Sequence, residues 1–521
     1  MAALALCLAL FFGSENVFLV FSAFEASALP IFLVVAFFGK RSQKFRAANY
    51  LLYFTLAGGL PLLAVLLTLY AATGSVLRPE LAALLAEGRV PAVAGWEGLL
   101  FLVCFLPFGV KLAFFPLHSW LPEAHVEAST EGSMLLSGIL LKLGFYGLLQ
   151  YCLGLWGGAL FGVAPLLLTL ALVGATAAAL ATYRQLDLKK VIAYSSVVHM
   201  NLALFGYLTL APAALAAALF LNFGHAVVSA GLFGAVGLLQ ERSRSRHLLE
   251  LSGLAAVLPL WSGALLLLLL ANAGLPGTVG FVGEAPLLWG CFRAYPYAGL
   301  LLTLPTALMG LRCFLLHSQL CWGTAPAYLN PRPLAGGGVL FRSWDISPGG
   351  EGAVTLALAA ASLLLGLWPS PLLGLLAPAA VGPLAALAPL AAPLAAVAVA
   401  VAAVAVAAPL AALAAAGTDL RCPLPGAGFP NPPAPRSRFP PAPDRPSGSG
   451  SGLLPTKFRR RWGSTPRRRR RGGGFFSPEA PAPVFLSQFP VPVFCFRFPP
   501  HPSAAPPPRR RRAPLPLPTQ P

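Results

Sequence analysis

Long apolar runs, each bounded by polar or charged positions, fill most of the first 380 residues. A helix of about 20 apolar residues crosses the hydrocarbon core of a bilayer. The runs predict spans near 15–38, 48–71, 97–116, 131–153, 159–182, 191–209, 213–238, 254–290, 295–316 and 352–376. Residues 1–12 resemble the last part of a further span. We therefore expect an all-α polytopic membrane protein with about 11 or 12 transmembrane helices.

Two of these spans contain residues that interrupt a helix. The run 254–290 is too long for one straight helix, and Pro276 and three glycines lie at its centre. The run 97–116 contains Pro107 and Gly109. Broken helices at membrane depth are tolerated only where they are buried in protein or line a wet cavity. About five spans separate the two interruptions, which predicts two inverted five-helix repeats around a transport site.

Four charged residues, Glu25, Lys111, Lys142 and Glu284, fall inside predicted spans. A charge at mid-bilayer costs at least about 2.5–3.5 kcal/mol on insertion scales, so such residues usually mark ion or proton paths. A set of two acids and two lysines favours a transporter that moves protons between buried titratable groups. The alternative is that they are structural ion pairs that join helices.

Loop charges predict the orientation of the spans. Three basic clusters fall on the same side of the predicted membrane, whereas loops such as 72–96 are nearly neutral. The positive-inside rule puts this side on the cytoplasmic or matrix face. The clusters are Lys40, Arg41, Lys44 and Arg46; Arg184, Lys189 and Lys190; and Arg242, Arg244 and Arg246.

Composition agrees with a membrane protein and excludes several other classes. The chain is 57% hydrophobic and 10% charged, whereas a soluble domain has roughly 25% charged residues. Its eight cysteines form no C-x-x-C pair, which argues against a disulfide framework, a zinc site or an iron–sulfur cluster. Nucleotide-binding and metalloprotease motifs are also missing from the sequence. We expect no metal and no cofactor bound by this chain.

The last part of the chain has a different character. Half of the 36 lysines and arginines lie in residues 417–521, so the pI near 10.1 comes mainly from this tail. Its Pro/Arg/Gly/Ser-rich composition predicts disorder. Anionic lipid or RNA could bind the arginine runs, but the composition favours biased codons or read-through with no function. The predicted divisions are 1–320, an antiporter-like core; 321–380, a loop and final helix; 381–416, a possible extra Ala/Val-rich helix; and 417–521, the tail.

The body of the chain resembles the NADH–ubiquinone oxidoreductase chain 4 family, the antiporter-like subunit M of respiratory complex I. Five motifs in the family's order carry the resemblance over roughly residues 1–376. They are FLVFSAFEASALP at Phe18–Pro30, GVKLAFFPLHSWLPEAHVEASTEGSMLLSGILLKLGFYG at Gly109–Gly147, DLKKVIAYSSVVHM at Asp187–Met200, HAVVSAGLF at His225–Phe233 and ANAGLPGTVGFVGE at Ala271–Glu284.

The resemblance implies a role for each charged residue of the spans. Glu25 and Lys111 match the family's buried pair, Lys142 its central proton-exchanging site and Glu284 its exit or connecting site. His199 and His225 match histidines of the hydrated axis, as relay sites or as helix-joining donors. The residues themselves suggest that His118 and His125 lie nearer the surface, that Glu123 and Glu127 are solvated loop acids, and that Lys189 and Lys190 are anchors at the basic side. The roles and positions given for these residues are predictions.

The implied function is that of a proton-translocating subunit of complex I in the mitochondrial inner membrane, or of a bacterial plasma membrane. NADH, FMN, iron–sulfur clusters and ubiquinone would belong to partner subunits of the membrane and electron-transfer arms. The alternatives are a subunit of a multi-chain Na⁺/H⁺ antiporter or membrane-bound hydrogenase, and a structural subunit with inactive sites. Two departures stand out: the chain begins about three spans late for the family, and Ala113 stands where relatives commonly place a proline.

Overall fold

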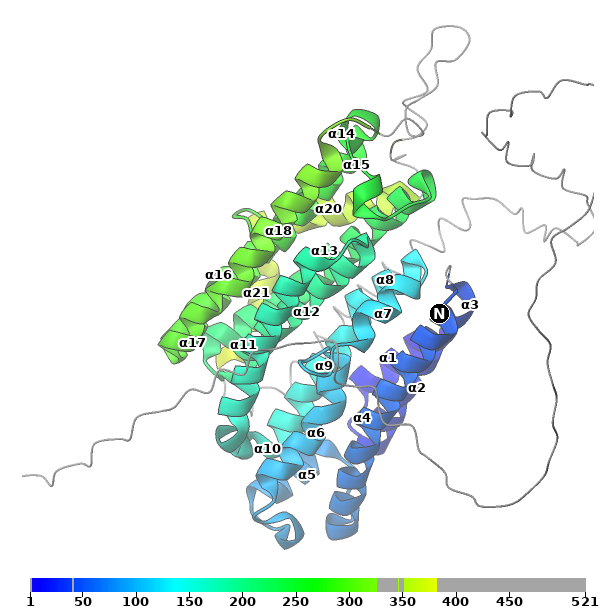
Figure 1. Cartoon of the computed structure of the whole chain (residues 1–521). Helices are drawn as coiled ribbons and strands as arrows, with labels where there is room; N and C mark the ends of the chain where they lie inside the picture. Colours follow the sequence, from blue (N-terminus) through cyan, green and yellow to red (C-terminus); the bar gives the residue numbers. More distant parts are fainter. Residues whose placement is uncertain (1, 40–41, 326–344, 346–350, 382–521) are drawn as a thin grey trace, which may run out of the picture. The chain divides into compact units, whose positions relative to one another are not determined.

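The computed structural model describes residues 2–39, 42–325, 345 and 351–381. This part of the chain is built from helices, and its only extended pairings are isolated bridges between Asn16 and Leu77 and between Asp187 and His247. Figure 1 shows the helices arranged side by side, with α12 and α13 between the α6–α9 segment and the α16–α18 segment. The all-α fold expected from the apolar runs is confirmed.

The helices of the described residues have the following bounds. They are α1 (Ala2–Gly13), α2 (Val17–Ala26), α3 (Ala28–Phe38), α4 (Lys44–Thr73), α5 (Arg78–Ala86), α6 (Glu97–Lys111), α7 (Trp120–Glu127), α8 (Thr130–Leu135), α9 (Leu141–Gly147), α10 (Gly154–Trp156), α11 (Leu160–Arg184), α12 (Leu188–Leu208), α13 (Pro212–Ser243), α14 (Leu254–Val257), α15 (Pro259–Asn272), α16 (Val279–Ala294), α17 (Pro296–Leu301), α18 (Thr303–Cys321), α20 (Glu351–Leu367) and α21 (Ser370–Val381). Two π-helical segments, η2 (Leu136–Leu140) and η3 (Leu148–Leu153), flank α9. Short 3₁₀ segments are η1 (Pro91–Val93), η4 (Gly157–Ala159) and η5 (Leu248–Glu250).

Several helices begin at a residue that caps their first turn. The side chain of Asn16 accepts hydrogen bonds from the backbone N–H groups of Phe18 and Leu19 at the start of α2. Asp187 accepts from the Lys189 N–H at the start of α12, and Ser129 accepts from the Gly132 N–H at the start of α8. Short side chains with an oxygen acceptor favour these positions because the first N–H groups of a helix have no backbone partner.

Within the described residues, seven helical stretches are long and apolar enough to cross a membrane, or eight if the bent pair of α20 and α21 forms one span. This number is below the 11 or 12 expected from the apolar runs. The broken spans account for part of the difference, because α6, α15 and α16 have 15, 14 and 16 residues and are each too short to cross alone. The N-terminal α1 has only 12 residues.

Both predicted interruptions are present. Helix α6 ends at Lys111, and Ala113 beyond it has a φ of 55°, in the left-handed region. The chain between α15 and α16 turns through Gly274 and Gly277, both at positive φ, which glycine adopts without the steric penalty of a Cβ atom. Helix α6 therefore ends at Lys111 even though position 113 is alanine, where relatives commonly have a proline. Whether the two halves form inverted repeats stays a prediction.

The predicted span at 352–376 is wrong as a single straight helix. Helices α20 and α21 meet at an angle of 74° around Trp368 and Pro369. A proline restricts the residue before it to extended backbone, and Pro369 therefore ends the first helix. The expected helix at 381–416 and the basic tail at 417–521 lie outside the described residues, except for Val381 at the end of α21.

Burial separates inner helices from outer ones. The apolar stretches of α12, of α13 and of the segment Thr130–Ala159 are 94%, 83% and 89% buried, whereas that of α4 is 39% buried. Helices α12 and α13 pack on each other, and α11 and α16 pack on their outer sides. The inner helices are therefore the ones that can hold charged side chains away from lipid. They carry Lys142, His199 and His225.

Candidate functional site

Lys142 lies in the middle of the Thr130–Ala159 segment, on the short helix α9 between two π-helical turns. Its ammonium Nζ donates to the backbone carbonyl of Ser137, 2.6 Å away. Ser137 belongs to the π-helical segment η2, and such segments are frequent at functional sites. Nζ also lies 2.9 Å from Nδ1 of His225 on α13, which is 83 residues away in the sequence. The local backbone therefore aims the lysine at a histidine of a neighbouring helix.

His225 begins a series of close polar groups that reaches Glu284. The ring centroids of His225 and His199 are 5.5 Å apart. His199 lies on α12, and its Nε2 is 2.9 Å from Oε1 of Glu284 on α16. Both histidines are buried, as is Glu284. Lys142, His225, His199 and Glu284 thus form one series across four helical segments, which we call the Lys142–Glu284 series.

The hydrogen bonds of His199 fix where a proton resides. Its Nδ1 lies 2.8 Å from the carbonyl oxygen of Ser195, which can only accept, so Nδ1 carries a hydrogen. The bond between Nε2 and Glu284 then holds one further proton, either on the imidazolium or on the carboxylic acid. The pair can exchange that proton over 2.9 Å without separating charges over a longer distance.

Glycines make room for the carboxylates. A side chain at Gly274, in the break between α15 and α16, would come within 2.5 Å of Oε2 of Glu284. On α4, a side chain at Gly59 would overlap the carboxylate of Glu25. In both places the backbone of another segment closely approaches the acid, which only a residue without a Cβ atom permits.

Lys111 and Glu25 are near each other, but the expected direct pair is not present. The Lys111 ammonium donates to Oγ of Ser27 at 3.2 Å and lies 4.8 Å from the centre of the Phe24 ring. These two residues flank Glu25 on the sequence. Among the described residues, neither carboxylate oxygen of Glu25 has a hydrogen-bond partner, although both are buried. Ser27, which the sequence analysis missed, is therefore the polar contact of the lysine.

The segment that separates Lys111 from Lys142 is apolar. Helix α9 packs on α6, with Gly144 against Leu112 and Gly147 against the ring of Phe108. No hydrogen bond that involves a described side chain joins the two lysines. Asn201 of α12 lies next to the break after α6 and accepts from the Phe115 N–H at 3.4 Å. The structure thus divides the six predicted site residues into a group of two and a group of four, in which Lys142 contacts His225, His199 contacts Glu284, and the two histidine rings lie 5.5 Å apart.

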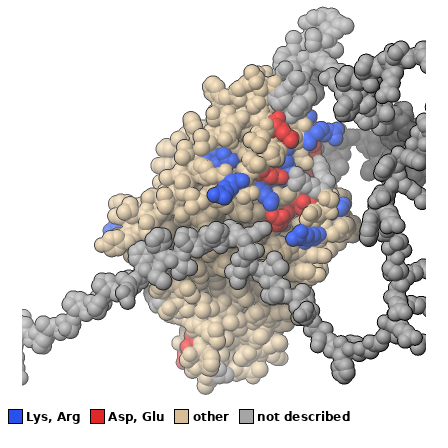
Figure 2. All heavy atoms as spheres, viewed as in Figure 1, with Lys and Arg blue, Asp and Glu red and all other residues tan. Residues whose placement is uncertain are grey.

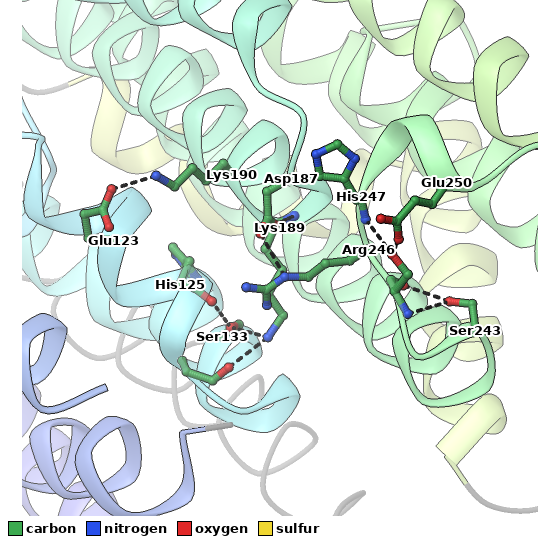
Figure 3. Close-up of polar contacts among 12 residues, drawn as sticks. Glu123, His125, Ser133, Asp187, Lys189, Lys190, Ser243, Arg246, His247 and Glu250 are labelled. Carbon is green, nitrogen blue, oxygen red and sulfur yellow. Dashed lines mark hydrogen bonds and ion pairs between the residues drawn. The ribbon is translucent and has the colours of Figure 1, made fainter. Parts of the chain in front are cut away.

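Charged side chains gather at one end of the helices, as Figure 2 shows for the visible face. Lys190 forms an ion pair with Glu123 at 2.8 Å, and Arg246 pairs with Asp187 at 2.9 Å. Figure 3 shows that these pairs join α7, the start of α12 and the chain after α13. We call the region of Glu123, Asp187, Lys190 and Arg246 the charged end. The prediction that the second and third basic clusters share one side is confirmed.

Three predictions about this end need correction. Lys189 is 2% exposed, and its ammonium donates to the Ala128 carbonyl at 2.9 Å, so it belongs to the core and not to the surface (Figure 3). Glu127 is buried rather than solvated. His125 lies on α7, is fully buried and stacks on the Phe233 ring at 4.3 Å. Burial, with Lys189 nearby, holds the pKa of His125 well below its usual value. The burial of these three side chains depends on how the helices pack, which the sequence does not show.

The described residues contain no group of three His, Cys, Asp or Glu side chains arranged to hold a metal ion. Free cysteines, mostly buried, are Cys7, Cys104, Cys152, Cys291, Cys313 and Cys321. Two of them serve as hydrogen-bond acceptors, Cys313 for Asn272 and Cys321 for Ser262. The side chains gathered in the site are lysine, histidine, glutamate and serine, which can donate or accept protons.

Comparisons with known proteins agree with this arrangement. Residues 14–310 match the family model described as NADH:quinone oxidoreductase/Mrp antiporter, transmembrane. NADH-ubiquinone oxidoreductase chain 4 of Acanthamoeba castellanii is 36% identical over 301 residues, which cover 57% of this chain and 59% of the relative. The protein of the same name from Prototheca wickerhamii is 32% identical over 365 residues, covering 70% and 66%. The chain therefore spans about three fifths of the first of these relatives.

Solved structures show the same fold. A chain of respiratory complex I from Thermus thermophilus with bound NADH superposes with a TM-score of 0.62 at 27% identity, covering 74% of this chain and 76% of the other. A chain of the Mrp complex from Dietzia superposes with the same TM-score at 22% identity, covering 76% and 78%. Because the family model matches more than half of the chain, this protein belongs to the NADH:quinone oxidoreductase/Mrp antiporter transmembrane family.

Proposed function

We propose that this chain is a proton-translocating membrane subunit of NADH:ubiquinone oxidoreductase in the mitochondrial inner membrane. The proposal is supported by the names of the relatives, NADH-ubiquinone oxidoreductase chain 4, and by the Lys142–Glu284 series. In the assembled enzyme, other membrane-arm subunits contact this chain. Partner subunits hold NADH, FMN and the iron–sulfur clusters and bind ubiquinone. The charged end then faces the matrix, because short basic loops favour that side.

The single observation that carries the proposal is the 2.9 Å contact between the Lys142 ammonium and His225 Nδ1. Lys142 is the proton donor in this contact, and the histidine is the base beside it. The N–H bond of Lys142 breaks as one forms at Nδ1 of His225. When Glu284 has released the proton that it shares with His199, the imidazolium of His225 gives up its Nε2 hydrogen, and that proton takes the vacant place between His199 Nε2 and Glu284 Oε1. The ring separation of 5.5 Å requires one bridging water or a ring rotation for this second transfer.

Glu25 and Lys111 control the first transfer in this proposal. Ionic groups in a medium of low dielectric constant interact strongly over several ångströms. When Glu25 moves towards or away from Lys111, the charge on Lys111 is stabilised differently, and Lys142 on the adjacent α9 responds. The groups titrate as a set and not singly. The carboxylate of Glu25 is suited to such movement, because no described group holds it by a hydrogen bond.

The test is the Lys142→Ala variant of the assembled enzyme, reconstituted in vesicles and supplied with NADH and a quinone. We expect proton transfer through this chain to stop, because alanine has no proton to pass to His225. The protons pumped per NADH oxidised are measured with a pH-sensitive dye. The matched control is Lys190→Ala, which removes an exposed lysine paired with Glu123. Unchanged pumping per NADH in Lys142→Ala would remove the proposal.

A second candidate is a subunit of an Mrp-type Na⁺/H⁺ antiporter. The observation in its favour is that the family model includes both classes, and the fold superposes equally well on the Mrp complex. Purification of the native assembly separates the two candidates. An assembly that oxidises NADH supports the first, and an assembly without flavin that exchanges Na⁺ for protons supports the second.

A further inference from the structure

A small cavity lies on the side of the Lys142–Glu284 series that faces the charged end. It is partly open and lined by residues of α12, α13, α15 and α18, and its volume is ≈ 10 Å³, which is about the space of one water molecule. Most of its wall is apolar, but three polar side chains also line it: Ser195, Asn272 and Arg312. A cavity with several polar groups of this kind holds water, whereas purely apolar cavities of this size stay dry.

Arg312 is the charged group of this cavity. It lies on α18 and is 4% exposed. Its Nε donates to the Thr182 carbonyl at 3.2 Å, its Nη1 donates to Oε1 of Gln319 at 3.3 Å, and its guanidinium lies 5.8 Å from the centre of the Tyr183 ring. No carboxylate of the described residues forms an ion pair with it. The positive charge is therefore held in place by neutral groups and is not cancelled by a neighbouring acid.

One side of the cavity borders the proton-holding pair of His199 and Glu284. Ser195 lines the cavity, and its backbone carbonyl is the acceptor for Nδ1 of His199. Asn272 ends α15, two residues before Gly274, which abuts the carboxylate of Glu284. A water in the cavity would thus be within a short distance of the pair.

The other side of the cavity leads to the charged end. Thr182, which holds the guanidinium, is in the last turn of α11. That helix runs into Asp187, the partner of Arg246 at the charged end. Ile192 and Val191, from the first turn of α12 after Asp187, complete this part of the cavity wall. The arginine therefore lies between the charged surface and the His199–Glu284 pair.

We propose that Arg312 is an electrostatic barrier that prevents protons at the charged end from reaching Glu284 directly through this cavity. The inference rests on the proposed function, in which Glu284 receives protons by way of Lys142. A direct connection from the matrix to Glu284 would bypass Lys142 and let protons flow without electron transfer.

The chemistry of the guanidinium suits this task. Arginine does not lose its proton in proteins, so it cannot itself relay one. A hydronium ion in a one-water cavity beside it would meet a like charge in a medium of low dielectric constant. Fixed arginine charges exclude protons and cations from narrow water-filled paths in the same way. The cavity can therefore hydrate the His199–Glu284 pair without conducting protons.

The test measures passive proton leak in the assembled enzyme, reconstituted in vesicles without NADH. A potassium diffusion potential drives protons, and a trapped dye reports the pH. We expect Arg312→Gln to raise the leak at least about tenfold, because a unit charge several ångströms from the path changes the barrier by that much or more. Arg312→Lys keeps the charge and should leak like the parent. Gln319→Glu retains the arginine but places a carboxylate against it, and should raise the leak by a smaller factor.

Two further variants identify the path. Arg312→Gln combined with Glu284→Gln should return the leak to the parent value, because the acceptor is gone. Arg293→Gln removes an exposed arginine from the end of α16 and should change nothing. An assembled Arg312→Gln enzyme that leaks no more than the parent overturns the inference. An Arg312→Lys enzyme that leaks as much as Arg312→Gln also overturns it. If Lys142→Ala abolishes pumping while Arg312→Gln does not leak, the inference fails and the proposed function stands.

Discussion

Lys111 is buried and Lys142 is partly buried on an adjacent helix, and the groups around the two lysines differ. Lys142 contacts a titratable partner at 2.9 Å, and the series continues through a second histidine to Glu284. Lys111 contacts only the Ser27 hydroxyl and the Phe24 ring, and Glu25 lies close by without a direct bond. The first arrangement can pass a proton from group to group. The second can change its charge state, but no titratable base among the described residues is hydrogen-bonded to the Lys111 ammonium.

This difference suggests that the Lys142–Glu284 series conducts protons and that Glu25 and Lys111 control the conduction. Conduction needs a series of donors and acceptors within hydrogen-bond reach. Control of that conduction needs an ion that can move, and a carboxylate that no hydrogen bond holds in place can do so. Under the proposed function, the apolar layer of Phe108 and Leu112 between the two lysines would allow their charges to interact while preventing direct proton transfer between them.

Breaking the series at its second member should have the largest effect of the three variants that follow. His225→Gln retains a polar side chain but cannot accept the proton of Lys142 as an imidazole does. We expect proton transfer through this chain to fall by about 100-fold, the usual contribution of a positioned acid or base. NADH-driven acidification of vesicles measures it. His247→Gln, at the charged end, is the matched control, and equal loss in both variants would contradict the series.

Changing the contact of Lys111 should have a smaller effect. Ser27→Ala removes the hydroxyl that accepts from Nζ, while the Phe24 ring remains. Loss of a hydrogen bond to a buried charge is worth about 1.5–3 kcal/mol, so we expect proton pumping to fall by about tenfold. Ser27→Thr keeps the hydroxyl and should retain most of the activity. A Ser27→Ala enzyme as impaired as His225→Gln would show that the two halves do not differ in role.

The smallest effect is expected at His125, which lies outside both groups. Because its pKa is lowered in the folded chain, the unfolded chain binds a proton at His125 near pH 6.5, whereas the folded chain does not. The folded chain is therefore not destabilised by His125 above about pH 6.5, where the residue is neutral in both states. Below about pH 6.5 the free energy of unfolding declines as the pH falls, because only the unfolded chain binds the proton.

His125→Phe should preserve the stacking on Phe233 and remove that acid sensitivity. Thermal denaturation of the purified enzyme between pH 5 and pH 8 measures it. The expected result is a smaller loss of melting temperature below about pH 6.5 in the variant than in the parent. Pumping at pH 7.5 should not change. A parallel decline in both enzymes would show that other groups determine the acid sensitivity.

Much of the site could be predicted from the sequence because a charge in an apolar run is conspicuous. The four charged positions and the two histidines were all identified in this way or by resemblance, and the structure places four of them in one series. Ser27 could not be recognised, since a serine in an apolar run carries no comparable signal. Arg312 lies inside the predicted span 295–316, four residues before its end, and the sequence analysis missed it, because the sequence does not show whether a charge near the end of a span faces lipid or other helices.

The sequence by itself determined that the chain is a helical membrane protein, where two of its helices break and which ionisable groups are embedded. These properties depend on hydrophobic length, on proline and glycine, and on the cost of burying charge, which are local. The tertiary structure alone decided that Lys142 meets His225, that Glu25 makes no direct bond with Lys111 and that Arg312 lines a small cavity together with Ser195 and Asn272. Such contacts join residues tens to more than a hundred positions apart, and only the mutual packing of the helices brings them within ångströms.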